Sequence, residues 1–128
     1  MNLFFKLIKQ KYVSVGVPVI IQNSKGEILL GKRNMNMPTY PGFWGLPGGM
    51  PEYGEKIENT AIREVKEELD IDIKIIKKSK NVYENLPDKK CRFHSVDVPF
   101  YGKIVRGIAK PKDETKEVKW FKPSEIRN

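Results

Sequence analysis

The stretch GGMPEYGEKIENTAIREVKEEL, residues 48–69, concentrates acidic side chains in a chain that is otherwise strongly basic. Its glutamates stand at positions 52, 55, 58, 64, 67 and 68, whereas the whole chain has a formal net charge of +8. Neighbouring carboxylates repel one another, so such a cluster is costly unless a positive group binds to it. The stretch therefore predicts a bound cation.

The second half of this stretch has the apolar periodicity of a helix over residues 57–69. Glu64, Glu67 and Glu68 then share one arc of about 100° beside the apolar stripe. Mg²⁺ prefers oxygen ligands and is usually held by one or two carboxylates together with substrate phosphates. A chain with one histidine and one cysteine argues against a zinc site. The apolar stripe consists of Ile57, Ala61, Ile62, Val65 and Leu69.

Composition favours a single domain over residues 1–128, since 128 residues and 14.8 kDa suit one compact core. Cys91 is the single cysteine, so no internal disulfide can form, and a reducing, cytoplasmic setting is expected. The 24 Lys and Arg residues against 16 Asp and Glu favour anionic partners such as phosphates or nucleic acid. A lysine-rich solvated surface explains the same excess.

The first eleven residues, MNLFFKLIKQK, are interrupted by Lys6 and Lys9 and lack a small-residue cleavage site, so they do not form a signal peptide. Their apolar residues instead predict one face of a short helix packed on the domain, in preference to a membrane-surface anchor. No later segment approaches membrane-spanning length, so no membrane partner is expected. The apolar residues are Leu3, Phe4, Leu7 and Ile8.

The rest of the chain indicates strands. Residues 12–22 are β-branched and apolar, and the turn NSKG and the strand EILLGKR follow them. The apolar run suggests a strand covered on both faces, with Pro18 at an edge, bulge or strand end. Residues 34–48 predict an irregular functional loop. Residues 71–107 predict two or three strands, and those from Pro111 onward a loop, a short strand and the start of a terminal helix.

Residues 49–71 resemble the signature of the Nudix hydrolases: glycine, five residues, glutamate, seven residues, then Arg-Glu-hydrophobic-any-Glu-Glu-any-Gly-hydrophobic. Asp70 stands where this pattern has glycine, and aspartate tolerates the left-handed conformation that ends a helix better than most residues do. The matching residues are Gly49, Glu55, Arg63, Glu64, Val65, Glu67, Glu68 and Ile71.

The segments GKR at 31–33, FWGLPGG at 43–49 and EVKWF at 117–121 also resemble the usual layout of this family, so the resemblance covers most of residues 12–126. It implies a MutT-like α/β protein with the Nudix fold, an α/β/α sandwich around a central mixed β-sheet. The signature would form a loop, a helix and a turn.

The resemblance implies that a water molecule cleaves the diphosphate linkage of a nucleoside diphosphate derivative with the help of Mg²⁺ or Mn²⁺. By position, Glu64, Glu67 and Glu68 would hold the metal together with a backbone carbonyl at Gly48 or Gly49. Glu64 or Glu67 would accept the proton of the water.

Two further roles follow from the resemblance. Arg63 and Glu55 would orient the metal-binding acids through a charge-assisted hydrogen bond. Glu114, ahead of the last predicted strand, would add one more metal ligand. Asp113 and Glu117 are rivals for that role, and an ordinary solvated acid remains an alternative for all three.

Aromatic residues in the loop offer surfaces for the nucleoside. Tyr40, Phe43 and Trp44 could stack on a base and Arg33 could reach a phosphate, although Trp44 fits a core position better. The remaining polar residues have ordinary explanations: His94 as a strand residue, and Glu52 and Glu58 as solvated acids.

The motifs are most similar to those of the nucleoside triphosphate pyrophosphatase group, whose substrates include oxidised nucleotides. An ADP-ribose or nucleotide-sugar pyrophosphatase is an alternative, for which Pro87 is a weak indication that turn formation explains equally well. A non-catalytic nucleotide sensor or an RNA 5′-end binding protein is a third, less favoured because all three acids are retained. Monomer and homodimer both remain open.

Overall fold

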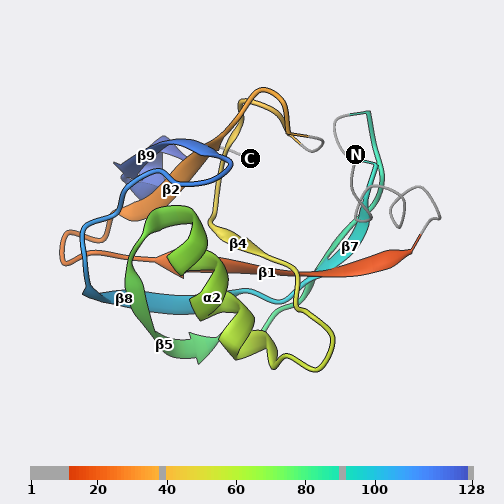
Figure 1. The fold of residues 1–128 in the computed structure, drawn as a ribbon, viewed down its shortest axis with the longest axis horizontal. Coiled ribbons are helices and arrows are strands. Elements are labelled where there is room, and N and C mark those ends of the chain that lie inside the picture. The colour runs from red at the N-terminus through yellow and green to blue at the C-terminus, as the bar shows by residue number, and fades with distance from the viewer. Residues whose placement is uncertain (1–11, 38–39, 90–91, 127–128) are drawn as a thin grey trace.

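The structure is a computed structural model that describes residues 12–37, 40–89 and 92–126 (Figure 1). The N-terminal segment for which a short packed helix is predicted lies outside these residues. The elements are β1 (Val13–Ile21), β2 (Ile28–Arg33), β3 (Trp44–Gly45), β4 (Gly48–Gly49), α2 (Ile57–Leu69), β5 (Asp72–Lys78), β6 (Tyr83–Asn85), β7 (His94–Asp97), β8 (Phe100–Arg106), β9 (Thr115–Phe121) and the 3₁₀ turn η1 (Pro123–Glu125).

Helix α2 has the bounds that the apolar periodicity predicts. It ends because Asp70 adopts the left-handed conformation, with φ 57° and ψ 38°, and its backbone N–H donates to the Lys66 carbonyl at 3.0 Å. Aspartate thus performs the task that the family pattern gives to glycine, and the expected helix terminus is confirmed.

The predicted strand, turn and strand at the start of the chain are confirmed as β1, a turn and β2. The Asn23 side-chain oxygen accepts the backbone N–H groups of Lys25 and Glu27, and Gly26 has φ 78°. The two strands nevertheless enter different sheets and meet only at the bridge between Gln22 and Ile28.

The larger sheet has the order β5-β8-β1-β7-β6, with β4 on the other edge of β1, and the smaller sheet has the order β3-β2-β9. The larger sheet is mixed, because β1 runs parallel to β7 and β8 whereas β5 and β8 are antiparallel. Residues 71–107 form four strands, so the prediction of two or three was too low. Short β3 and β4 interrupt the predicted irregular loop, and η1 replaces the start of a terminal helix.

Pro18 lies where β1 changes neighbours. Residues 13–16 of β1 pair with β7 and residues 19–21 pair with β8, so the missing N–H of Pro18 falls at the break between the two ladders. On the opposite edge, the Val19 N–H donates to the Pro47 carbonyl at 2.8 Å. Proline therefore removes no ladder hydrogen bond here.

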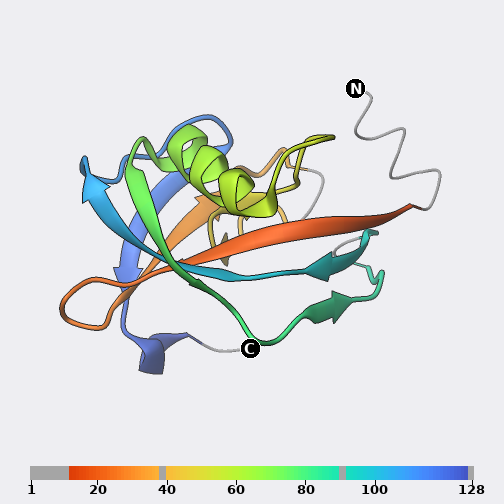
Figure 2. The same cartoon turned by 90° about the horizontal axis from the view of Figure 1, so that it is seen from below.

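The core lies between helix α2 and one face of β1, as Figure 2 shows. Burying a side chain of this kind contributes roughly 1.5–3 kcal/mol. The expectation that β1 is covered on both faces is wrong for its first half, because Val13 and Val15 are 55% and 39% exposed. The fully buried core residues of the described chain are Val17, Val19, Ile21, Leu29, Ala61, Val65, Leu69 and Ile71.

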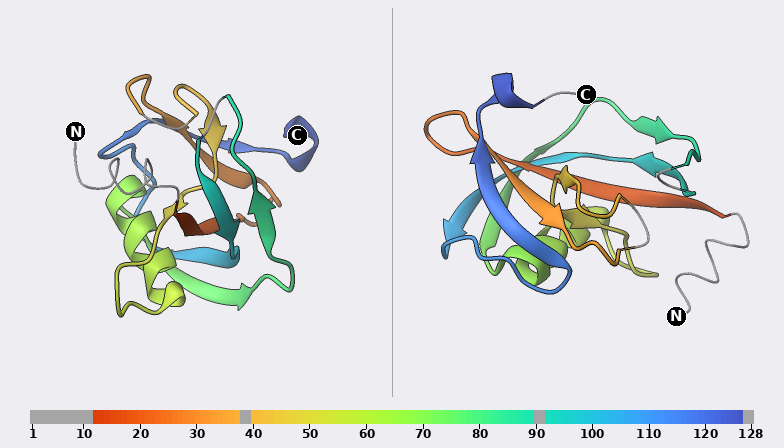
Figure 3. Two further views of the ribbon diagram at one scale, coloured as in Figure 1. Left: turned by 90° about the vertical axis from the view of Figure 1, so that its right-hand side faces the viewer. Right: turned by 90° about the horizontal axis from the view of Figure 1, so that it is seen from above.

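The mixed sheet and helix α2 agree with the expected α/β sandwich. In the described parts of the chain, α2 is the only α-helix, and it covers one side of the sheet (Figure 3). On the opposite side, among the described residues, the short turn η1 lies near the margin of the sheet. No helix in these parts of the chain is long and apolar enough to cross a membrane.

Candidate metal and diphosphate site

Arg63 is the centre of the polar network on helix α2. Its Nε and Nη2 atoms donate to both carboxylate oxygens of Glu55 at 2.8 and 3.0 Å, a bidentate pair. Its Nη1 donates to Glu64 at 2.8 Å and to Glu67 at 3.3 Å, and Nη2 also reaches the Met50 carbonyl at 3.2 Å. One guanidinium therefore holds three carboxylates and the backbone of the preceding loop.

Glu55 accepts hydrogen bonds from two side chains and one backbone N–H of the protein. Besides Arg63, the buried Thr60 hydroxyl donates to it at 2.7 Å and the Glu52 backbone N–H at 3.0 Å. The hydrogen bonds from Arg63, then from Thr60 and Glu52, lower the pKa of Glu55 to about 2. The Glu55 contact in turn raises the pKa of Arg63, so both groups are charged.

Glu64 and Glu68, in contrast to Arg63 and Glu55, are a pair of two carboxyl groups. Their carboxyl groups share a hydrogen bond, and the one backbone donor to Glu68 is the Gly48 N–H at 3.5 Å. Burial raises the pKa of Glu68, and the hydrogen bond to Glu64 and the charge of Glu64 raise it further, against the positive charge of Arg33. Arg63 contacts the Glu64 side of this pair, at 2.8 Å, so a cation bound beside Glu68 would relieve the repulsion between the two carboxyl groups.

The glycines beside this pair leave room for it. A β-carbon added to Gly49 would lie 2.4 Å from the Glu64 carboxyl carbon, so only glycine allows the carboxylate to approach β4 so closely. At Gly48 it would lie 2.2 Å from the Val17 carbonyl oxygen, and φ there is 145°. The sequence GG is thus required by the contact between β4, β1 and helix α2.

The oxygen donors at this place suit Mg²⁺ or Mn²⁺. Glu64 and Glu68 supply two adjacent carboxyl groups. The Glu64 carboxylate occupies the place that a β-carbon at position 49 would take. The three glutamates expected on one arc do not all converge, since Glu67 is 49% exposed and turns to Arg63. Within the described ranges, no three acidic, histidine or cysteine side chains form a ligand cluster, so a bound metal would need further oxygens from backbone, water or substrate.

Glu114 belongs to a loop that contacts the carboxyl end of helix α2 through Lys112. The Lys112 N–H donates to the Glu68 carbonyl at 2.9 Å, and the Glu114 carbonyl accepts the Asn34 N–H at 3.0 Å. The Glu114 side chain is exposed. Of its rivals, Glu117 lies 3.7 Å from Lys32, and Asp113 has φ 53° in the loop before β9.

The aromatic residues expected to contact the nucleoside divide into two groups. Tyr40 and Phe43 pack on each other with ring centres 5.7 Å apart, and Phe43 is 45% exposed. Trp44 packs edge-on against Phe121 at 5.1 Å and lines an apolar hollow of about 280 Å³ with Ile20. Trp44 is therefore half-buried. One part of its ring packs on Phe121, as expected for a core residue, and another part lines the hollow.

Arg33, at the end of β2, is near enough to Glu68 for its charge to lower the pKa of that carboxyl group. The residues set aside as ordinary have ordinary contacts. His94 lies 2.8 Å from Glu84 on the neighbouring strand, Glu52 is exposed beside Arg63, and Glu58 is exposed in the first turn of α2.

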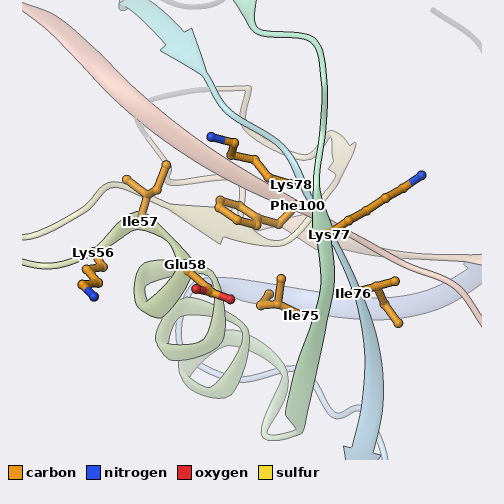
Figure 4. A pocket seen from close by; sticks show the side chains of 8 residues that line it. All are labelled: Lys56, Ile57, Glu58, Ile75, Ile76, Lys77, Lys78 and Phe100. Carbon is orange, nitrogen blue, oxygen red and sulfur yellow. The ribbon is translucent and has the colours of Figure 1, made fainter.

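A larger hollow, of about 420 Å³, lies at the other end of helix α2 (Figure 4). Lys56, Glu58 and Phe100 line it, two to three helical turns from Glu64 and Glu68. It is therefore separate from the paired carboxyl groups.

Sequence reasoning missed Thr60 and the Met50 carbonyl, which complete the surroundings of Glu55 and Arg63. Thr60 could have been noticed, because a buried threonine three residues before Arg63 falls on the same side of the helix. The Met50 carbonyl has no sequence signal, since backbone orientation depends on how the loop packs.

Comparison with known proteins places the chain. Residues 13–128 match the NUDIX domain family. The chain is 36% identical over 108 residues to an ADP-ribose pyrophosphatase of Methanocaldococcus jannaschii, covering 84% of this chain and 61% of that protein. It is 33% identical over 112 residues to a Bacillus subtilis protein provisionally named 8-oxo-dGTP diphosphatase, covering 87% of this chain and 68% of that protein.

Among solved structures, the MutT protein from Methanosarcina mazei Go1 superposes with a TM-score of 0.80 at 28% identity, over 91% of this chain and 81% of that one. The chain belongs to the NUDIX domain family and is a MutT-like Nudix hydrolase by sequence and fold. The expected family and α/β fold are confirmed. The chain spans less than two thirds of the length of the first relatives it matches.

Proposed function

We propose that the protein hydrolyses a nucleoside triphosphate, normal or oxidised, to a nucleoside monophosphate and pyrophosphate. The observation that carries this proposal is the Glu64–Glu68 pair, two adjacent carboxyl groups beside Gly48 and Gly49, in which burial and the neighbouring Glu64 raise the pKa of Glu68. Family membership supplies the reaction class.

The residues of the chain divide the work. Mg²⁺ or Mn²⁺ held by Glu64 and Glu68, with Glu67 as a third ligand if its side chain leaves Arg63, would neutralise phosphate charge and lower the pKa of a bound water. Arg63 holds Glu64 and Glu67 in place and is itself held by Glu55. One glutamate, Glu64 or Glu67, accepts the proton of the attacking water as the bridging P–O bond breaks.

The substrate is expected to lie near the start of the aromatic loop. The charge of Arg33 acts on Glu68, so Arg33 is placed to bind a phosphate group. Tyr40, Phe43 and Trp44 offer ring surfaces on which the base could stack. Glu114 remains a proposed additional metal ligand, brought toward the helix by its loop. A cytoplasmic monomer or homodimer that acts on a small nucleotide fits this reading.

ADP-ribose is the second candidate substrate, because a relative over 84% of the chain carries that name. The two candidates are separated by a panel of nucleoside triphosphates, oxidised triphosphates, ADP-ribose and nucleotide sugars, assayed with Mg²⁺. We expect the largest kcat/KM for a triphosphate. A value for ADP-ribose at least ten times higher than for every triphosphate would replace our proposal with the second one.

A further inference from the structure

We propose that the sheet face opposite helix α2 binds single-stranded RNA. The inference does not depend on the hydrolysis proposed above, because it concerns the other side of the sheet. It rests on a group of residues, the lysine face, that consists of Lys74, Lys77 and Lys103 around Tyr101.

Strand register places the lysine face on the side away from the helix. Ile73, Ile104 and Phe100 belong to the core or pack against it, so their neighbours in sequence point the other way. Lys74 stands directly opposite Lys103, and Lys77 opposite Tyr101. The register shifts between Ile75 and Lys77, which places Lys77 opposite Tyr101, and Lys77 also lines the hollow drawn in Figure 4.

The lysines of this face have no carboxylate partner. All three are exposed, and within the described parts of the chain none has an ion pair with an aspartate or glutamate. The acids near them are engaged elsewhere: Asp72 lies 3.7 Å from Arg106 and 3.5 Å from Lys66. Like charges directly opposite on adjacent strands repel, so Lys74 and Lys103 form a site that an external anion would stabilise.

Tyr101 gives the face an aromatic centre. The Lys77 Nζ atom lies 5.1 Å from the centre of the Tyr101 ring. Ile20 of β1 pairs with Tyr101 and lies on the same face of the sheet. Ile20 also lines the apolar hollow with Trp44, so the surface continues from the lysines to a second aromatic residue. Tyr101 and Trp44 are both half-buried, so each presents part of its ring at this surface. A positive surface with partly accessible rings on a sheet is the arrangement that binds single-stranded nucleic acid by stacking and phosphate contacts.

Binding is tested by fluorescence anisotropy with a twelve-nucleotide oligouridine that has a 5′-hydroxyl end, in buffer with EDTA. This probe has no diphosphate linkage and the buffer no free metal, so failure of the hydrolysis proposal cannot affect the result. With three phosphate contacts, log affinity should fall with log salt concentration with a slope of about −2.

The triple variant Lys74→Gln, Lys77→Gln, Lys103→Gln should lose at least about ten-fold in affinity at low salt and most of the salt slope. The matched control is Lys25→Gln, Lys56→Gln, Lys110→Gln, which removes the same charge from the turn and the helix side and should change affinity less than two-fold. Equal losses in the two variants would overturn the proposal, because they would show a non-specific charge effect.

Tyr101→Leu separates stacking from charge. It should weaken binding by about five-fold or more while the salt slope stays unchanged, with folding checked by circular dichroism. Undiminished binding in this variant would contradict the proposed role of the ring. Vesicles of phosphatidylserine are the comparison ligand, and binding to vesicles without binding to the oligonucleotide would overturn the proposal.

Discussion

Glu55 and Glu68 are both carboxylates of the same signature, yet the protein treats them in opposite ways. Glu55 accepts hydrogen bonds from Arg63, Thr60 and a backbone N–H, and its pKa falls to about 2. Glu68 faces another carboxyl group, and its pKa is raised. The first carboxylate is stabilised by the folded chain, whereas the second is left to be stabilised by something that binds.

The largest effect is expected at the Glu64–Glu68 pair. Glu64→Gln or Glu68→Gln should lower kcat by about 10²–10⁴-fold, because a metal ligand or proton acceptor is lost. For Glu68→Gln the Tm without metal should not fall, since glutamine removes a buried like-charge contact. Glu58→Gln, on the exposed side of the same helix, is the control. A pair of variants with normal turnover would show that the two carboxylates are not in the site.

Arg63 should come next. Arg63→Lys keeps the charge but cannot hold Glu55 through two bonds while it reaches Glu64, so metal affinity or activity should fall by about 10–100-fold. The measurement is kcat against Mg²⁺ concentration, with part of the loss recovered at high Mg²⁺. If activity falls without any change in metal dependence, Arg63 has another role.

A smaller effect on kcat is expected when a side chain is added at Gly49, beside the Glu64 carboxylate. Gly49→Ala would place a β-carbon 2.4 Å from the Glu64 carboxyl carbon, which must move. We expect a loss of about ten-fold in kcat, comparable to losses on disturbing the support of a metal ligand. Gly45→Ala is the matched control, because an added β-carbon there meets nothing within 4 Å. The same kcat in both variants would argue against a role for the close approach.

The smallest effect concerns Glu55 and acid stability. Its pKa of about 2 lies below the ordinary 4.5, so its stabilising contribution is complete above about pH 4.5 and disappears as the pH falls toward 2. Glu55→Gln should lower stability at pH 7 and reduce its decrease between pH 4.5 and 2, as followed by urea unfolding. An unchanged acid dependence would mean that Glu55 is not held as described.

The two carboxylates also show how far sequence reasoning reaches. Periodicity sufficed for the bounds of helix α2, and the signature for the residues around Arg63, because both depend on neighbours a few positions apart. The turn of Glu67 to Arg63 is likewise local, because the two residues are four apart on the helix. The position of the Glu64–Glu68 pair against Gly48 and Gly49, in contrast, depends on how β4 pairs with β1. That pairing joins Gly48 to Pro18, which no local pattern predicts.

The sheet face opposite helix α2 shows where sequence reasoning stops. Lysines 74, 77 and 103 read in sequence as solvated charges, and only the strand register brings them together around Tyr101. A surface made of several strands is thus visible only after the topology is known.

The most direct test is the binding of Mn²⁺, measured by electron paramagnetic resonance in the presence of an α,β-methylene nucleoside triphosphate that cannot be cleaved at that position. The wild-type complex should bind Mn²⁺, and the Glu64→Gln, Glu68→Gln double variant should bind it at least about ten-fold more weakly while remaining folded. Equal Mn²⁺ affinity in the two proteins would contradict the claim that this pair of carboxyl groups is the cation site.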